Sequence, residues 1–212
     1  MTLSFPPSPA SGQTYQNWQW DGAKWVPYAA PSVIVTSGNR VLLSKQTVTT
    51  PVASVAFTSL FSNAYDIYEL DIVDVTVSAA GVFLQARVSA DGGATWITTS
   101  TYSYGGFYTS GTTGNYVGSA SASAAALVEG DVPNVAGTAC SIKLRMFQPW
   151  RTDLYKAWMT DTITITTAAG GLSRAMLGGQ MGGGLAAYNS LQISAGSGNI
   201  NSGVLNLYGV KP

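Results

Sequence analysis

The sequence predicts an all-β protein, an antiparallel β-sandwich of the jelly-roll type preceded by a small N-terminal β-hairpin module. Apolar and polar residues alternate along many short segments, which is the period of a half-buried strand. Glycine, proline, asparagine and aspartate separate those segments, as turns require. No segment of useful length carries the 3.6-residue period of an amphipathic helix. These three observations favour a sandwich of about eight to ten strands.

Residues 1–31 form the first predicted domain, and residues 32–212 form the second. In the first domain an Asp21-Gly22 pair separates two short aromatic segments, which is a strong signal for a hairpin. So short a hairpin cannot bury its own aromatic side chains and is marginally stable alone. We therefore expect it either to pack on the main domain or to dock into a partner and attach the protein there. The residues expected to make this contact are Phe5, Tyr15, Trp18, Trp20 and Trp25.

Strand signals run through the second domain from Val33 onwards. Apolar residues alternate from Tyr68 to Ile72, and they alternate again from Val73 to Val77 on the opposite face. This change of parity predicts a β-bulge or a crossing between sheets. The other expected strands lie within residues 34–43, 45–57, 82–88, 96–104, 140–147, 161–167, 191–194 and 204–208.

Two segments rich in glycine and small residues interrupt this pattern, residues 105–126 and residues 168–187. We expect both to be long loops, which are uncommon inside a compact domain and often carry function. The second segment has an alternative interpretation, close packing of backbones at a symmetry axis, because glycine lets chains approach each other. The sequence leaves both interpretations open.

The segment Ser89–Trp96 has the pattern Ser-x-Asp-x-Gly-x-Thr-Trp and directly follows an alternating strand. Aspartate and glycine tolerate the left-handed backbone that a tight hairpin turn demands. The pattern resembles the Asp-box of secreted and virion β-proteins, which is a structural turn and not a catalytic site. We therefore assign a structural role to Ser89, Asp91, Gly93 and Trp96.

The chain carries few charges. Charged residues make up 9% of the sequence, against about 25% in a typical globular domain, and ten basic residues balance ten acidic ones. Such a balance gives no electrostatic attraction to nucleic acid or to an anionic membrane. No apolar run approaches the length of a membrane span, so we expect no membrane insertion. Because an uncharged surface is hard to keep soluble as a free monomer, we expect a homo-oligomer or a position on a large particle.

The residue inventory argues against catalysis and metal binding. The chain has no histidine, which removes the commonest general base and the commonest zinc ligand. Its acidic residues fit turns and surface positions better than a glycosidase pair, and neither a calcium loop nor a phosphate loop is present. The single cysteine, Cys140, lies in an alternating segment and is expected to be a small buried hydrophobe. We therefore expect no catalytic residue, no metal and no cofactor.

Binding of a neutral sugar fits the composition better, because a pyranose ring has an apolar face that can stack on an aromatic side chain. The chain has 11 Tyr and 6 Trp, several of them in segments expected to be loops. Each of these residues could instead fill a β-core or a subunit interface. The residues expected to contact glycan are Tyr102, Tyr104, Phe107, Tyr108, Tyr116 and Trp150.

Three parts of the chain, in order, resemble virion proteins of tailed bacteriophages. The opening, from Phe5-Pro6-Pro7 to Lys24-Trp25, resembles a short module near the N-termini of phage fibres and other virion structural proteins. The middle, Tyr68-Glu69-Leu70 and then residues 84–96, resembles the sheet of a phage jelly-roll domain. The end, residues 196–210, resembles the closing strand of that domain.

The resemblance implies a non-enzymatic structural protein of the virion, assembled in the host cytoplasm: a head fibre, a head spike, a tail fibre or a tail-tip protein. It implies a homo-oligomer, expected to be a trimer, whose N-terminus is fixed to other virion proteins and whose jelly roll contacts host-surface polysaccharide. No catalytic residue of such a family has a counterpart in this chain. The alternatives are a capsid decoration protein, which cements its neighbours, and a polysaccharide depolymerase.

Overall fold

The computed structural model describes residues 8–11, 13–15, 18–27, 40–79, 81–128, 132–135, 137–165 and 171–211. Over these residues the chain forms β-strands and no helix, so none of them belongs to a helix that could cross a membrane. The chain divides into two units, Met1–Gly38 and Asn39–Pro212. The boundary expected after residue 31 lies outside the described residues, as does Phe5.

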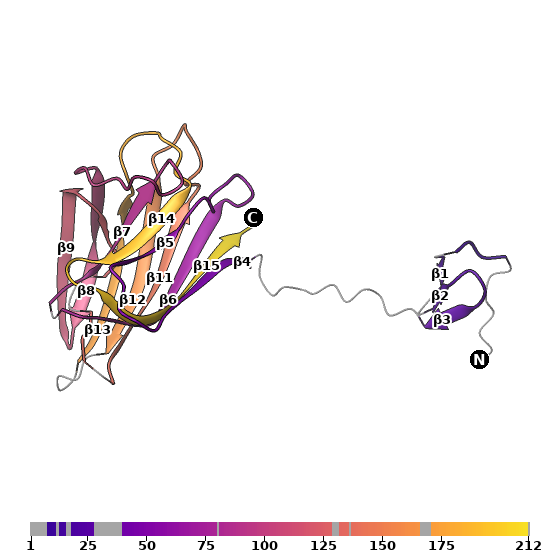
Figure 1. The fold of residues 1–212 in the computed structure, drawn as a ribbon, viewed down its shortest axis with the longest axis horizontal. Helices are drawn as coiled ribbons and strands as arrows, with labels where there is room; N and C mark the ends of the chain where they lie inside the picture. The colour runs from indigo at the N-terminus through magenta and orange to yellow at the C-terminus, as the bar shows by residue number, and fades with distance from the viewer. Residues whose placement is uncertain are drawn as a thin grey trace. The chain divides into compact units, whose positions relative to one another are not determined.

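The first unit contains a three-stranded antiparallel sheet made of β1 (Thr14–Tyr15), β2 (Trp18–Trp20) and β3 (Trp25–Pro27) (Figure 1). Strands β2 and β3 form a hairpin around the Asp21-Gly22 turn. The Oδ1 atom of Asp21 accepts hydrogen bonds from the amides of Ala23 and Lys24, both at 2.8 Å. Gly22 has a φ of +106°, a conformation that costs glycine little. Strand β1 adds a third strand that the sequence analysis does not predict.

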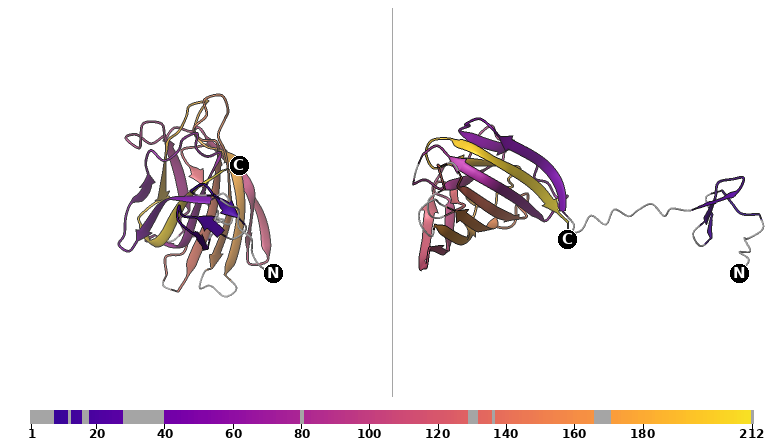
Figure 2. Two further views of the ribbon diagram at one scale, coloured as in Figure 1. Left: turned by 90° about the vertical axis from the view of Figure 1, so that its right-hand side faces the viewer. Right: turned by 90° about the horizontal axis from the view of Figure 1, so that it is seen from below.

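The second unit is an antiparallel sandwich of an eight-stranded sheet and a four-stranded sheet (Figures 1 and 2). The larger sheet has the order β4-β15-β6-β11-β12-β13-β8-β9, and the smaller has the order β10-β7-β14-β5. The prediction of an all-β antiparallel sandwich is therefore confirmed. The strands are β4 (Arg40–Val48), β5 (Ser54–Phe57), β6 (Ile67–Val77), β7 (Leu84–Ser89), β8 (Tyr102–Ser110), β9 (Thr113–Ala122), β10 (Ala125–Ala126), β11 (Ala139–Phe147), β12 (Ala157–Ile165), β13 (Leu172–Gln180), β14 (Ser190–Ala195) and β15 (Ile200–Val210).

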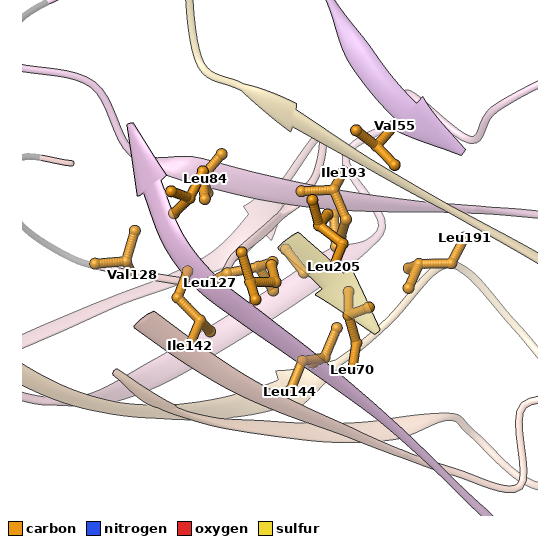
Figure 3. Packing of buried hydrophobic residues seen from close by; sticks show 14 of the residues in the cluster. Val55, Leu70, Leu84, Leu127, Val128, Ile142, Leu144, Leu191, Ile193 and Leu205 are labelled. Carbon is orange, nitrogen blue, oxygen red and sulfur yellow. The ribbon is translucent and has the colours of Figure 1, made fainter. Parts of the chain in front are cut away.

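A hydrophobic core joins the two sheets. Burying these side chains is the main favourable contribution to the fold, because each strand removes every second residue from water. Figure 3 shows residues of both sheets pointing toward one another. The larger sheet contributes Leu70, Ile142, Leu144 and Leu205, and the smaller sheet contributes Val55, Leu84, Leu191 and Ile193.

Strand β6 contains the predicted change of parity. Ile72 and Val75 both point into the core, while Val73 between them is exposed. Asp74 has a φ of +52°, and the pairing register of β6 with β11 shifts at this point. These features define a β-bulge. Of the two predicted alternatives, a bulge and a crossing between sheets, the bulge is confirmed.

The prediction that residues 105–126 and residues 168–187 are long loops is wrong. Most described residues of the first segment belong to the hairpin β8–β9, and the second segment contains β13, which pairs with β8. A Cβ atom on Gly106 would lie 2.0 Å from the carbonyl oxygen of Met176, its near neighbour on β13. Glycine therefore lets β8 and β13 pair closely, and this backbone approach lies within one chain.

Two hairpins make the larger sheet wider than its partner. In sheet order, β12, β13, β8 and β9 continue from β11 to the edge of the larger sheet. The face of this sheet turned away from the four-stranded sheet is called the outer face below. No other described strand of the second unit covers this face, and many of its side chains are exposed.

Candidate interaction surface

The outer face concentrates the exposed apolar residues of the sandwich. Fifteen large hydrophobic residues are exposed among the residues that the structure describes. Nine of the fifteen lie on the outer face, although surface hydrophobic residues are normally scattered. They are Leu42, Val73, Phe107, Tyr116, Met159, Ile163, Ile165, Leu172 and Met176.

The pairing registers place these side chains in rows. Asp161 lies opposite Met176, Met176 lies opposite Phe107, and Phe107 lies opposite Tyr116. Directly opposed residues of antiparallel strands point to the same face, so one row crosses four strands. At its end the rings of Phe107 and Tyr116 meet edge to face, with their centroids 5.7 Å apart.

Strand β12 has apolar side chains on its exposed side and mostly threonines on its core side. Its buried positions hold Trp158 and three threonines, whereas its exposed positions include Met159, Ile163 and Ile165. The sequence analysis does not single out this strand as a surface. The available signal was that threonines occupy one parity of residues 159–165, while Met159, Ile163 and Ile165 share the other parity with Asp161. Alternation alone does not say which parity faces the core.

At least eight of the chain's charged residues share the outer face with these apolar residues. The carboxylate of Glu69 is 6% exposed and lies 2.6 Å from Nε of Arg40 and 2.7 Å from Nε of Arg145. Arg40 also reaches Asp71, with an N–O distance of 2.7 Å, and its guanidinium lies over the ring of Tyr208. This clamp links strands β4, β6, β11 and β15. These residues are Arg40, Lys45, Glu69, Asp71, Lys143, Arg145, Asp161 and Arg174.

A second ion pair lies nearer the middle of the outer face. Nη2 of Arg174 lies 3.1 Å from Oδ2 of Asp161, and Lys143 lies opposite Asp161 on the adjacent strand. The hydrogen bond from Arg174 to Asp161 raises the pKa of Arg174. Beside this pair is a shallow depression whose lining includes Val73, Lys143, Asp161 and Ile163. Apolar side chains and both signs of charge are thus interspersed.

The aromatic residues expected to contact glycan do not form one platform. Tyr102 is fully buried, where its hydroxyl donates to the carbonyl oxygen of Ile97 and accepts from the amide of Val88. Burial raises the pKa of Tyr102 to about 12. The expectation that Tyr102 contacts glycan is therefore wrong, because it is a core residue of the sandwich.

The other five expected glycan contacts lie in three places. Tyr104 and Tyr108 have the parity of the inner side of β8, and both are partly buried. Phe107 and Tyr116 point to the outer face, and Tyr116 is 89% exposed. Trp150 lies in the loop after β11, where its indole N–H donates to the carbonyl oxygen of Tyr65 at 2.9 Å.

The Asp-box segment forms a turn held by its own side chains. Oδ1 of Asp91 accepts from the hydroxyl of Ser89 at 2.6 Å and from the amide of Thr95 at 2.9 Å, and Oδ2 accepts from the hydroxyl of Thr95 at 2.5 Å. These bonds hold the pKa of Asp91 well below its usual range. Gly93 has a φ of +91°, and a Cβ there would lie 3.2 Å from the ring of Trp96. Both carboxylate oxygens are thus engaged within the turn.

The first unit presents a second surface, which we call the tryptophan face. Trp20 lies directly opposite Trp25, with their ring centroids 5.7 Å apart, and Trp18 shares this side by alternation along β2. All three side chains remain half-buried within the unit. The backbone of Tyr15 pairs with that of Trp18.

The described residues offer little for metal or nucleophilic chemistry. No group of three or more His, Cys, Asp or Glu side chains among them could hold a metal ion. Cys140 is fully buried, and its Sγ accepts a hydrogen bond from the hydroxyl of Thr164 at 3.4 Å. Burial raises the pKa of the Cys140 thiol to about 11, so the reactive thiolate is scarce near neutral pH.

No family model matches the chain, and neither a curated protein nor a solved structure does.

Proposed function

We propose that this chain is a non-enzymatic structural protein of a tailed-bacteriophage virion, a fibre, spike or tail component assembled in the host cytoplasm. Its first unit attaches it to other virion proteins, and its sandwich forms a homo-oligomer, expected to be a trimer, that contacts host-surface glycan. One observation carries the proposal: the chain has two separate units, and each presents a surface suited to contact, the tryptophan face and the outer face.

The strand order supports the jelly-roll part of this proposal. When the hairpins β8–β9 and β12–β13 are set aside, four strands remain in each sheet, in the orders β4-β15-β6-β11 and β10-β7-β14-β5. Along the chain these eight strands change sheet at every step except one, because β7 and β10 both lie in the smaller sheet. Eight strands in two sheets are typical of a jelly roll. The two hairpins are then insertions that widen one sheet.

The outer face supports a role in an assembly. Contiguous apolar patches on a soluble protein mark interaction sites or aggregation hazards. A chain with 9% charged residues has little electrostatic repulsion to keep such patches apart in solution. Covering this face inside a particle removes the hazard, and this fits a structural protein better than a free enzyme.

Glycan contact is assigned to the exposed aromatic pair. Tyr116 and Phe107 lie on the edge hairpin β8–β9, where a sugar ring can reach them. We expect Tyr116→Ala to lower binding of the purified protein to host cells at least several-fold. Tyr155→Ala is the matched control, because Tyr155 is also exposed but lies in the loop between β11 and β12. Equal binding by both variants would remove this assignment.

The attachment role is tested by deleting residues 1–38, the whole first unit. Phage that carry the truncated gene are purified, and the protein is sought in the particles by immunoblotting. We expect the truncated protein to accumulate in the lysate and to be missing from the particles. The variant Trp20→Ala, which removes half of the tryptophan pair, should reduce incorporation in the same direction. Full incorporation of the truncated protein would contradict the attachment role.

Two further measurements separate the proposal from its alternatives. A depolymerase would release reducing ends from host polysaccharide, whereas a binding protein releases none. A capsid decoration protein would not bind host cells, and particles lacking it would lose capsid strength. Binding to cells without release of reducing ends is the expected result.

A further inference from the structure

We infer that the outer face is the surface through which copies of this chain contact one another, with Ile163 on β12 near the centre of the contact. The inference rests on the proposed homo-oligomer and names the surface that forms it.

The first argument is the distribution of apolar side chains on β12. Thr160, Thr162 and Thr164 occupy the core side, while Ile163 and Ile165 on the same strand are 48% and 55% exposed. In an isolated sandwich this arrangement is unfavourable, because burying isoleucine stabilises the fold more than burying threonine does. The arrangement becomes favourable when a second surface covers the outer face.

The second argument is continuity across strands. Ile165 lies opposite Leu172, and both are exposed, so the patch does not end at β12. Met176 extends it to β13, and the inferred contact stops before the Phe107–Tyr116 pair of the edge hairpin, which stays open to glycan. On the other side of β11, Val73 is turned outward by the β6 bulge. A bulge that re-aims an apolar residue toward solvent is the kind of local feature found beside functional surfaces.

The third argument identifies the occupant. The outer face carries positive residues, Arg40, Lys45, Lys143, Arg145 and Arg174, as well as negative ones, Glu69, Asp71 and Asp161. A partner with one sign of charge, such as a nucleic acid, would meet repulsion as well as attraction here. A second copy presents the same apolar rows and both signs of charge. Exposed Asp161 of one copy can then face exposed Arg174 of the next, and the chains need no other component.

The experiment compares two substitutions that place the same charge at two equally exposed aliphatic positions. Ile163 is 48% exposed on the outer face, and Leu185 is 45% exposed in the loop between β13 and β14. The full chain and the variants Ile163→Asp and Leu185→Asp are measured by light scattering during gel filtration. We expect the full chain and Leu185→Asp to have the same mass, a multiple of 22.0 kDa, and Ile163→Asp to have the mass of one chain.

A cross-linking variant keeps the inference testable if Ile163→Asp fails to fold. The native Cys140 is fully buried, so the variant Ile163→Cys carries one accessible thiol. Oxidation, or a short bifunctional thiol reagent, should link copies through this position on a non-reducing gel. The matched variant Leu185→Cys should give no linked product.

Three results would overturn the inference: a full chain that remains a monomer, an Ile163→Asp variant that keeps the full mass, or an Ile163→Cys variant that does not cross-link. Capture of the outer face by another protein with no copy-to-copy contact would also overturn it. These results are distinguishable from failure of the proposed function. If the chain oligomerises through Ile163 but is absent from virus particles, the inferred contact is supported and the proposed virion role is contradicted.

Discussion

At Asp91 a single carboxylate organises the turn between β7 and the segment that leads to β8. It accepts hydrogen bonds from Ser89 and Thr95, so the ionised form is stabilised by neighbours that the unfolded chain does not hold in place. Because the turn also reaches Asn189, whose side-chain oxygen accepts from the amide of Gly92, it connects two loops of the sandwich. The residue is therefore structural, and its carboxylate has no free oxygen for chemistry.

Replacing Asp91 with alanine should lower the thermal midpoint at neutral pH, because the turn loses all three acceptor contacts. The folded-state pKa of Asp91 lies below 3.8, the ordinary pKa of an aspartate side chain, so the ionised carboxylate contributes stability above that pH. This contribution is lost as pH falls below 3.8 toward the folded-state pKa. Thermal denaturation followed by circular dichroism should show the difference between wild type and Asp91→Ala shrinking in acid. A difference that is constant with pH would contradict the assignment.

At the scale of elements, β12 shows how the interior of the larger sheet is filled. Thr160 and Thr162 are both buried and lie two positions apart on the same side. The hydroxyl of Thr162 donates to the carbonyl oxygen of Leu127 at 3.1 Å. The hydroxyl of Thr160 has no hydrogen-bond partner among the described residues. The two side chains are identical, but only the hydroxyl of Thr162 has a hydrogen-bond partner among the described residues.

Valine substitutions should separate these two threonines. Thr160→Val removes an unpartnered buried hydroxyl and should raise the free energy of unfolding by about 1 kcal/mol. Thr162→Val breaks a buried hydrogen bond, leaves a carbonyl without its donor and should lower it by about 1 kcal/mol. Urea denaturation measures both. Equal effects of the two substitutions would contradict this account of β12.

The clamp around Glu69 joins elements that are distant in the sequence. Its carboxylate is nearly buried between Arg40 of β4 and Arg145 of β11. Glu69→Gln removes the charge that offsets both guanidinium groups and should lower the free energy of unfolding by about 2 kcal/mol. In the control Asp153→Asn, the carboxylate that pairs with Arg151 is 61% exposed, so solvent screens the pair and the loss should be much smaller than that of Glu69→Gln. Chemical denaturation of both variants provides the test, and similar losses would show that the clamp has no special role.

At the scale of the whole molecule, the two units should fold separately. All described members of the hydrophobic core cluster lie between Val48 and Leu207, within the second unit. We therefore expect deletion of residues 1–38 to leave the main calorimetric transition of the sandwich unchanged in midpoint and enthalpy. A midpoint that falls by several degrees would mean that the first unit packs on the sandwich. The same measurement shows that the truncated chain used to test attachment is folded.

The sequence predicted the features that depend on neighbouring residues. Alternation gave the all-β class, Asp21-Gly22 gave the hairpin, and the parity change near Ile72 gave the bulge. The glycine-rich stretches were wrongly predicted to be loops, because glycine has a poor intrinsic strand propensity. Glycine is required at position 106 because the neighbouring strand β13 leaves no room there for a side chain. That neighbour lies about 70 residues away in the chain, so a local pattern does not reveal it.

By itself, the sequence determined the class of the fold, its local turns and the low charge of its surface. Only the tertiary structure decided which parity of each strand faces the core. That choice buried Tyr102, turned Ile163 outward and brought Glu69 between two arginines from other strands. The physical reason is that a period of two residues fixes two faces but does not distinguish them. The distinction comes from long-range pairing, which sets the strand order and leaves one face of the larger sheet uncovered.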